Sequence, residues 1–203
     1  MATPIIRRAF ARRAKNQSDG FSLIEVVISM AILTVGLISL LGVFGLAMAS
    51  TQSSQSDLIA KQLANEYYES IITARNSTEI GWDAVNNAGS TNCASGVASC
   101  GIFTVGLTPI YNSGADGVYG TADDSASGEQ TLQDPGPDGI YQTVDDIMIP
   151  LTAYQRSILI APVYDSTGNL IYSIRSLSIT IQYSTPQNTQ KTYILNSYIS
   201  EFQ

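Results

Sequence analysis

Hydrophobic and polar positions divide the chain into regions with different periods. Residues 26–49 form a run of 24 residues without a charge. A helix of that length rises about 36 Å, which is enough to cross a bilayer. In residues 56–75, apolar or small side chains recur at the 3.6-residue spacing of an amphipathic helix. This stripe consists of Ala60, Leu63, Ala64, Tyr67, Ile71 and Ala74. The pattern therefore predicts one long helix whose first half spans a membrane.

The C-terminal part shows the alternation of strands. Three stretches rich in Ile, Tyr, Leu and Val are separated by turn-forming residues. They cover residues 157–164, 170–183 and 190–200. The alternation changes parity near Arg175 and Ser176, which predicts a bulge. We expect an antiparallel meander with one face packed on the helix.

The region between the helix and the meander gives weaker signals. Residues 76–101 are rich in Asn, Ser, Gly and Ala, which is typical of a loop. Trp82, the sole tryptophan, is expected to anchor this loop on the sheet. Residues 102–111 are a weak strand candidate, because Pro109 cannot donate to a sheet ladder.

Charge is unevenly distributed along the chain. The net charge is −7, but five of the ten Lys and Arg residues lie within residues 1–20. Beyond residue 20, five basic residues face sixteen acidic ones. A chain this acidic lacks the clustered Lys and Arg residues that bind phosphates. We therefore predict no direct contact with nucleic acid. The basic leader instead fits an orientation signal beside a membrane.

Glu25 stands directly before the apolar run and needs an explanation. A secretory signal peptide is one reading, with Ala47-Met48-Ala49 as a cleavage site, but its apolar region is shorter, at about 7–15 residues. A plain membrane anchor is another, but it gives Glu25 no role. Charged residues in a spanning segment are rare and usually functional.

A third reading accounts for all of these features together. The stretch Gly20-Phe21-Ser22-Leu23-Ile24-Glu25, after a basic leader and before a long apolar helix, resembles the signal of the type IV pilin superfamily. The resemblance implies that a prepilin peptidase and N-methyltransferase cleaves after Gly20 and methylates the new amine of Phe21. It also implies that Glu25 pairs with such an amine in a neighbouring subunit during assembly.

Within the superfamily, the apolar segment looks most like PilV-type minor pilins, with type II secretion pseudopilins as the neighbouring possibility. Many major pilins carry a proline in this segment, whereas this chain has none between Pro4 and Pro109. The resemblance implies an α+β, pilin-like fold in which a long N-terminal helix packs on a C-terminal antiparallel sheet. The expected parts are the leader 1–20, the transmembrane and assembly helix 21–50, its amphipathic continuation 51–75, and the head 76–203 with acidic loops 114–146 and the sheet 150–200.

The resemblance also implies a location and partners. The protein is expected in the bacterial inner membrane, with its C-terminus outside the cytoplasm, and then in an extracellular or periplasmic filament. Its partners would be the processing enzyme and other pilin subunits, contacted through the N-terminal helix. A filament-tip module that binds a ligand is an alternative from another class. We expect no enzyme, since no nucleophile–base pair is visible and the chain has no histidine.

An acidic motif occurs twice in the head. Residues 114–124, GADGVYGTADD, and residues 136–146, GPDGIYQTVDD, share seven identical positions at an offset of 22. No Lys or Arg lies between Arg75 and Arg156 to compensate these acids. Carboxylates at this density are candidate Ca²⁺ ligands, and solvated Asp-Gly turns are the alternative. The candidate ligands are Asp116, Asp123, Asp124, Asp138, Asp145 and Asp146.

The two cysteines lie close together in the sequence. Cys93 and Cys100 are seven positions apart within the predicted loop. In an exported domain, two neighbouring cysteines indicate a disulfide, with two free thiols as the alternative. We expect a disulfide that closes a small loop.

Overall fold

The computed structural model describes residues 20–94 and 97–202. The chain divides into two units with a boundary between Leu46 and Ala47, and each is described by itself. The α-helix α1, Leu23–Asn76, contains this boundary. The first turn forms when the backbone N–H groups of Glu25 and Val26 donate to the carbonyl of Ser22, at 3.0 and 3.2 Å.

In the first unit, residues 26–46 carry no charge and their side chains are exposed. Within it, Ser29, Thr34 and Ser39 are polar, and each hydroxyl donates to the backbone carbonyl four residues earlier, at 2.7 to 2.9 Å. These bonds satisfy the hydroxyls within the helix, as a nonaqueous environment requires. The helix is long and apolar enough to span a membrane.

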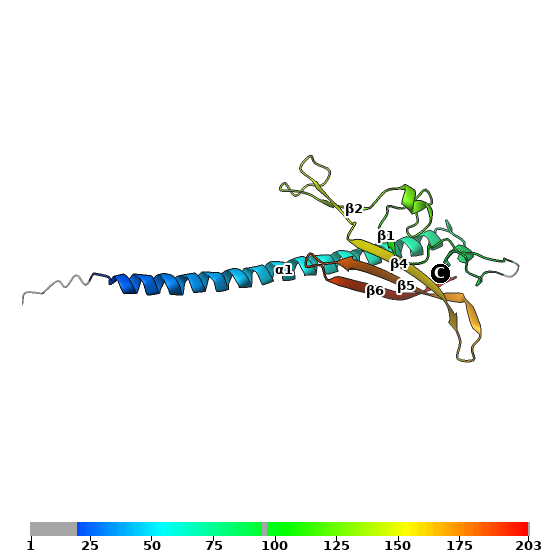
Figure 1. The fold of residues 1–203 in the computed structure, drawn as a ribbon. Helices are drawn as coiled ribbons and strands as arrows, with labels where there is room; N and C mark the ends of the chain where they lie inside the picture. The colour runs from blue at the N-terminus through cyan, green and yellow to red at the C-terminus, as the bar shows by residue number, and fades with distance from the viewer. Residues whose placement is uncertain (1–19, 95–96, 203) are drawn as a thin grey trace, which may run out of the picture. The chain divides into compact units, whose positions relative to one another are not determined.

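The second unit holds a four-stranded antiparallel sheet in the order β1-β4-β5-β6 (Figure 1). Its strands are β1, Thr108–Pro109; β4, Tyr154–Tyr164; β5, Leu170–Ser184; and β6, Gln190–Ser200. The three long strands form the predicted meander. The fold is therefore α+β, with a long N-terminal helix and a C-terminal antiparallel sheet, which confirms the predicted class.

The core lies between the C-terminal part of α1 and one face of the sheet. The six stripe residues of α1 predicted from the sequence are the six that the structure buries. On β5 the inward positions alternate over Leu177, Ile179 and Ile181. Burying each of these side chains contributes about 1.5–3 kcal/mol through the hydrophobic effect. The buried face of the helix repeats every 3.6 residues and that of the strand every 2 residues, and these two faces pack against each other.

The expected bulge is present, at the outer end of β5. Pro162 pairs with Arg175, but Val163 pairs with Ile171, so residues 172–174 have no partner in β4. The shift brings Arg175 onto the buried face, where its side chain is almost completely enclosed. This register shift between β4 and β5 therefore explains why the alternation in the sequence changes parity near Arg175.

Hydrogen bonds and an ion pair join α1 to the sheet just before the N-terminal end of the buried stripe. Asp57 of α1 accepts hydrogen bonds from the Tyr183 hydroxyl at 2.7 Å and from Lys191 at 3.0 Å. The hydrogen bond from Tyr183, followed by the one from Lys191, lowers the pKa of Asp57. Both charged side chains are more than a third exposed, so the ion pair contributes at most about 1 kcal/mol.

Two elements differ from the sequence expectation. The strand candidate at 102–111 shrinks to the two residues of β1, because Gly106 adopts a φ of 91° and Pro109 has no N–H to donate. The second element is a separate hairpin of β2, Thr131–Asp134, and β3, Ile147–Pro150, that the alternation did not predict. This β2–β3 hairpin stands apart from the four-stranded sheet in Figure 1.

Two 3₁₀ turns complete the head: η1, Trp82–Ala84, and η2, Asp123–Ala126. Trp82 anchors its loop as expected, because its indole N–H donates to the carbonyl of Tyr172 in β5 at 2.7 Å. The Arg175 guanidinium lies 4.1 Å from the Trp82 ring centroid, on its face. Such a cation–π contact favours this orientation of the loop.

Candidate functional site

The N-terminal site is built from the start of α1. Gly20 and Phe21 precede the helix, and Phe21 is 82% exposed. A Cβ atom placed on Gly20 would meet nothing within 4 Å. The peptide bond between these two residues is therefore open to a processing enzyme. The leader that the sequence predicts to be discarded lies outside the described residues, apart from Gly20.

Glu25 lies in the first turn of α1 with its side chain exposed. Among the residues that the structure describes, no group of the protein donates a hydrogen bond to this carboxylate or forms an ion pair with it. The N-terminal end of a helix favours a negative charge, worth about 0.3–1 kcal/mol at an exposed site. That gain keeps the carboxylate compatible with the helix, and its oxygens stay available to an external cation.

The first acidic motif, residues 114–124, packs onto the head. Asp124 is 1% exposed and forms a buried ion pair with Arg156 of β4. Its carboxylate also accepts hydrogen bonds from the backbone N–H groups of Gly114, at 3.1 Å, and Gly120, at 2.7 Å. The sequence predicted that no basic residue compensates the charge of these acids. For Asp124 this prediction is wrong, because Arg156, 32 positions later in the chain, forms an ion pair with it.

Arg156 connects this motif to the core. Its guanidinium lies 4.9 Å from the Tyr67 ring centroid and 6.0 Å from that of Tyr119. The two tyrosine rings meet edge to face at 5.2 Å. Burial raises the pKa of Tyr119 to about 12, and the neighbouring Glu66 carboxylate adds to this effect. Burial also raises the pKa of Tyr67, so both phenols stay neutral beside the arginine at physiological pH.

Three carboxylates of the first motif meet at one place. Asp116, Asp123 and Asp124 each offer an oxygen within 4.8 Å of the others. In the part of the chain that the structure describes, this is the group that could hold a metal ion. The sequence also proposed Asp138, Asp145 and Asp146, and the structure does not bring these three into the same group.

Many of the oxygens in this group already accept hydrogen bonds. The Thr121 hydroxyl donates to Asp123 at 2.6 Å and to Asp124 at 3.2 Å. The hydrogen bond from Thr121 lowers the pKa of Asp123, although partial burial opposes it. The carboxylates are therefore stabilised as anions by the protein itself, and a cation would add to this stabilisation rather than supply all of it.

The cysteine pair forms a disulfide. The Cys93 and Cys100 sulfurs are bonded, with the Cα atoms 5.9 Å apart. The loop they close lies against the buried Asn86, whose amide donates to the carbonyl of Asn92 at 3.0 Å. The disulfide and this hydrogen bond tie the segment around Cys93 and Cys100 to the head.

Residues 15–41 match the family model for the prokaryotic N-terminal methylation motif. The chain carries the type IV pilin signal. No curated protein and no solved structure matches the chain. The signal implies processing by a prepilin peptidase and assembly with other pilin subunits.

The type IV pilin signal gives the first unit of the structure a function. It covers the leader end, Glu25 and the first part of the apolar helix. Together with the exposed apolar helix, it fits an inner-membrane anchor before assembly. It also indicates a structural subunit, pilin-like or pseudopilin, rather than an enzyme. It does not extend to the acidic motifs, so these need a separate explanation.

We predict that Asp124→Asn destabilises the head by about 3–5 kcal/mol, because it leaves the buried Arg156 charge without its partner. The matched control, Asp123→Asn, removes a charge from the same turn but leaves this ion pair intact. Its expected cost is about 1 kcal/mol or less. Denaturant unfolding of the full chain in detergent, followed by the fluorescence of Trp82, measures both values. Equal losses in the two variants would contradict a special role for the Asp124–Arg156 pair.

Proposed function

We propose that this protein is a minor pilin, a structural subunit of a type IV pilus or a related filament. The observation that carries the proposal is the methylation motif at residues 15–41, which leads directly into a helix with exposed apolar side chains. In this proposal a prepilin peptidase cleaves after Gly20 and methylates Phe21. The parts are then the leader 1–20, the assembly helix 21–50 with its continuation 51–75, and the head 76–203.

The charges at the N-terminus direct assembly in this proposal. Cleavage removes the cationic leader and creates one cationic amine on Phe21. Glu25 of this subunit meets the corresponding amine of a neighbour, between packed apolar helices. In such a dry environment a lone carboxylate is strongly destabilised, whereas a paired one is tolerated. The pairing therefore selects the depth at which a subunit enters the filament.

The assignment as a minor rather than a major subunit rests on the apolar segment. No proline interrupts residues 26–49, and α1 is continuous through this segment. A type II secretion pseudopilin is the alternative with the same signal and the same assembly chemistry. The genes that neighbour this one distinguish the two, since a pilus system and a secretion system have different components.

The processing step gives the first prediction of this proposal. The mature protein is expected to begin with N-methylated Phe21, because the open Gly20–Phe21 bond follows the basic leader. N-terminal mass spectrometry of the protein purified from its native host measures this directly. A mature chain that begins at Ser50 would instead establish cleavage by signal peptidase after Ala49.

The assembly step gives the second. We expect Glu25→Ala to leave membrane insertion intact, because the apolar segment is unchanged, and to reduce the protein in sheared filaments at least about tenfold, as the loss of about 1.4 kcal/mol would. Glu69→Ala is the matched control, because it removes an exposed carboxylate from the head part of the same helix. Immunoblots of membranes and sheared filaments compare the variants. Normal amounts of the Glu25 variant in filaments would rule out the docking role.

We further propose that Ca²⁺ binds the acidic motifs and stabilises the head, as a second function carried by the group of Asp116, Asp123 and Asp124. Calcium accepts six to eight oxygen ligands in irregular geometry, so carbonyls and water can complete the shell around three carboxylates. An ion at this site would offset the repulsion that remains after Arg156 has paired with Asp124. The same chemistry would suit a head that binds a ligand at a filament tip.

Removal of calcium tests this proposal. The full chain in detergent is expected to melt at a higher temperature in millimolar calcium than in chelator, by the equivalent of about 2.7 kcal/mol at a hundredfold excess over Kd. Asp116→Asn combined with Asp123→Asn should reduce this difference while leaving the Asp124–Arg156 pair intact. Sodium chloride at equal ionic strength controls for screening. If sodium chloride reproduces the whole effect, the motifs bind no calcium.

A further inference from the structure

The two acidic motifs fold in the same way. In the first, the Asp116 carboxylate accepts from the backbone N–H of Val118 at 2.9 Å. In the second, Asp138 accepts from Ile140 at 2.8 Å, at the equivalent positions. The threonine of each motif also donates to both of its terminal aspartates: Thr121 to Asp123 and Asp124, and Thr143 to Asp145 and Asp146. The duplicated sequence is therefore a duplicated structure.

Their surroundings are different. The first motif buries Val118 completely, whereas its counterpart Ile140 is 61% exposed. Tyr119 is half-buried, whereas its counterpart Tyr141 is 61% exposed. The second motif forms the tip of the β2–β3 hairpin, between Asp134 and Ile147. One copy is thus docked on the head, whereas the equivalent copy, with the same kinds of side chain, is docked on nothing within residues 20–94 and 97–202.

The docked copy shows what such a motif binds. Asp124 pairs with a buried arginine, Val118 enters the core, and Tyr119 packs against the ring of Tyr67. The first motif therefore packs against a guanidinium that is surrounded by apolar and aromatic side chains of the same head.

The second copy has a neutral group where the first has this cation. In the first motif, Oδ2 of Asp124 accepts from Arg156. In the second, Oδ2 of Asp146 accepts from the side-chain amide of Gln133. The same carboxylate oxygen accepts in both motifs, but among the described residues no cation pairs with Asp146. A cation from outside can therefore replace the glutamine, in the way that Arg156 serves Asp124.

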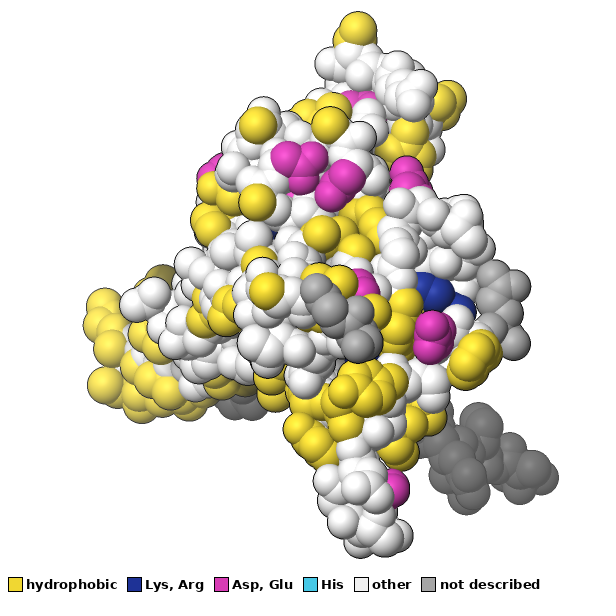
Figure 2. Space-filling view, turned by 90° about the vertical axis from the view of Figure 1, so that its right-hand side faces the viewer, with side chains coloured by type: hydrophobic (Ala, Val, Ile, Leu, Met, Phe, Trp, Pro, Cys, Tyr) yellow, Lys and Arg dark blue, Asp and Glu magenta, His cyan; other side chains and the backbone are white. Residues whose placement is uncertain are grey.

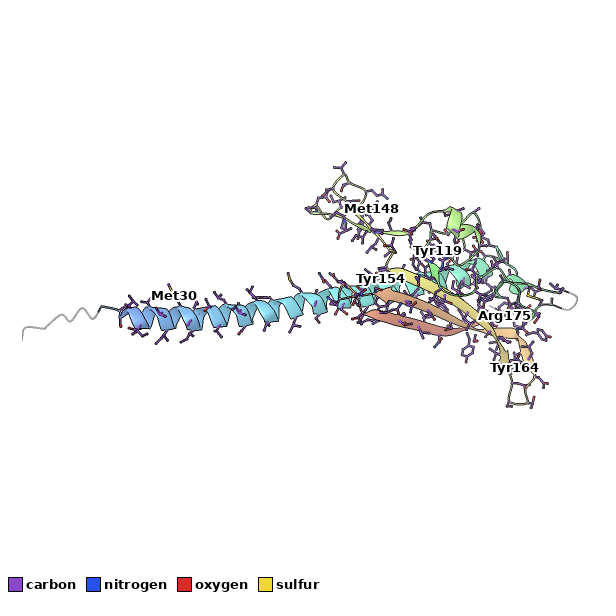
Figure 3. The ribbon with its side chains drawn as sticks, in the orientation of Figure 1. Met30, Tyr119, Met148, Tyr154, Tyr164 and Arg175 are labelled. Atoms are coloured by element: carbon purple, nitrogen blue, oxygen red, sulfur yellow. A yellow bond between two sulfur atoms is a disulfide. The ribbon has the colours of Figure 1, made fainter. Side chains whose placement is uncertain are left out.

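The β2–β3 hairpin also presents an apolar surface. All four residues of β3 are exposed, including Ile147, Met148 and Ile149 (Figure 3). An isolated two-stranded hairpin is marginally stable in water, and contiguous exposed apolar side chains commonly mark an interaction site. The hairpin thus has two features of a docking element: exposed apolar side chains on β3 and the carboxylate of Asp146.

We propose that the second motif docks on a neighbouring subunit of different sequence, which presents an arginine or lysine in an apolar hollow. Charge complementarity favours a different subunit over a second copy of this chain. Beyond residue 20 this chain has sixteen acidic and five basic residues. Of these five, Arg156, Arg175 and Lys191 already form ion pairs within the head. On the face shown in Figure 2, acidic side chains appear in several places and basic ones are scarce.

This inference rests on the proposed filament function, and photo-crosslinking in filaments tests it. A photoreactive benzoylphenylalanine replaces Val144, which is fully exposed and whose counterpart Ala122 stays exposed in the docked copy. The probe therefore lies at the rim of the proposed contact and does not block it. The control probe replaces Tyr164. This residue is also exposed, and it lies on the other projecting hairpin of the head (Figure 3).

The expected product is a crosslink from position 144, and not from position 164, to a different filament subunit identified by mass spectrometry. Asp146→Asn should reduce this crosslink about tenfold or more, because a hydrogen bond to a charged partner is lost. Asp138→Asn is the matched control, since it removes a charge from the same loop at a position whose counterpart, Asp116, does not contact Arg156. That variant should crosslink like the parent.

Several outcomes would overturn the inference. A crosslink to a second copy of this chain, a crosslink to lipid alone, or none from filaments that contain the protein would exclude a different subunit at this hairpin. Equal losses in the two aspartate variants would exclude a directed cation. These results leave the filament function intact. Absence of the protein from sheared filaments, with Gly20 uncleaved, would instead contradict the proposed function and the inference with it.

Discussion

The packing of α1 on the four-stranded sheet is the interaction on which the rest of the head depends. The buried face of α1 consists of the small residues Ala60, Ala64 and Ala74 and the larger Leu63, Tyr67 and Ile71, and it shares one core cluster with the inward residues of the strands. This interface also places Tyr67 beside Arg156, and therefore decides where the first acidic motif can dock. A change at Tyr67 would therefore be felt at the first acidic motif, which also contacts α1 through Ser70.

The same helix presents two different surfaces along its length. From Ala60 onward its apolar stripe is covered by the protein's own sheet, whereas the apolar residues of 26–46 are exposed and have no cover of their own. Water is a poor environment for so long an apolar surface. A bilayer before assembly, and the helices of other subunits afterwards, satisfy the same requirement. The pilin signal and the structure of the helix thus have one physical explanation.

Features set by local spacing could be predicted from the sequence. The helix stripe, the meander and the bulge beside Arg175 follow from periods that a few residues define. The Asp124–Arg156 pair could not be predicted, because its partners are 32 positions apart and are joined only by the fold. The two acidic motifs show the limit clearly. Val118 and Ile140 occupy equivalent places in nearly identical sequences, yet only Val118 is buried, since burial depends on what lies opposite.

The proposed function requires residues 26–49 to be covered by lipid or by other subunits in every state of the mature protein. The direct measurement is the reaction of a membrane-impermeant maleimide with a Leu37→Cys variant in sheared filaments, compared with a Tyr164→Cys variant. Leu37 is half exposed in the isolated chain, as is Tyr164. We expect Cys at position 164 to react fully and Cys at position 37 to stay unmodified until the filaments are dissociated in detergent. Equal labelling of the two positions in intact filaments would contradict it.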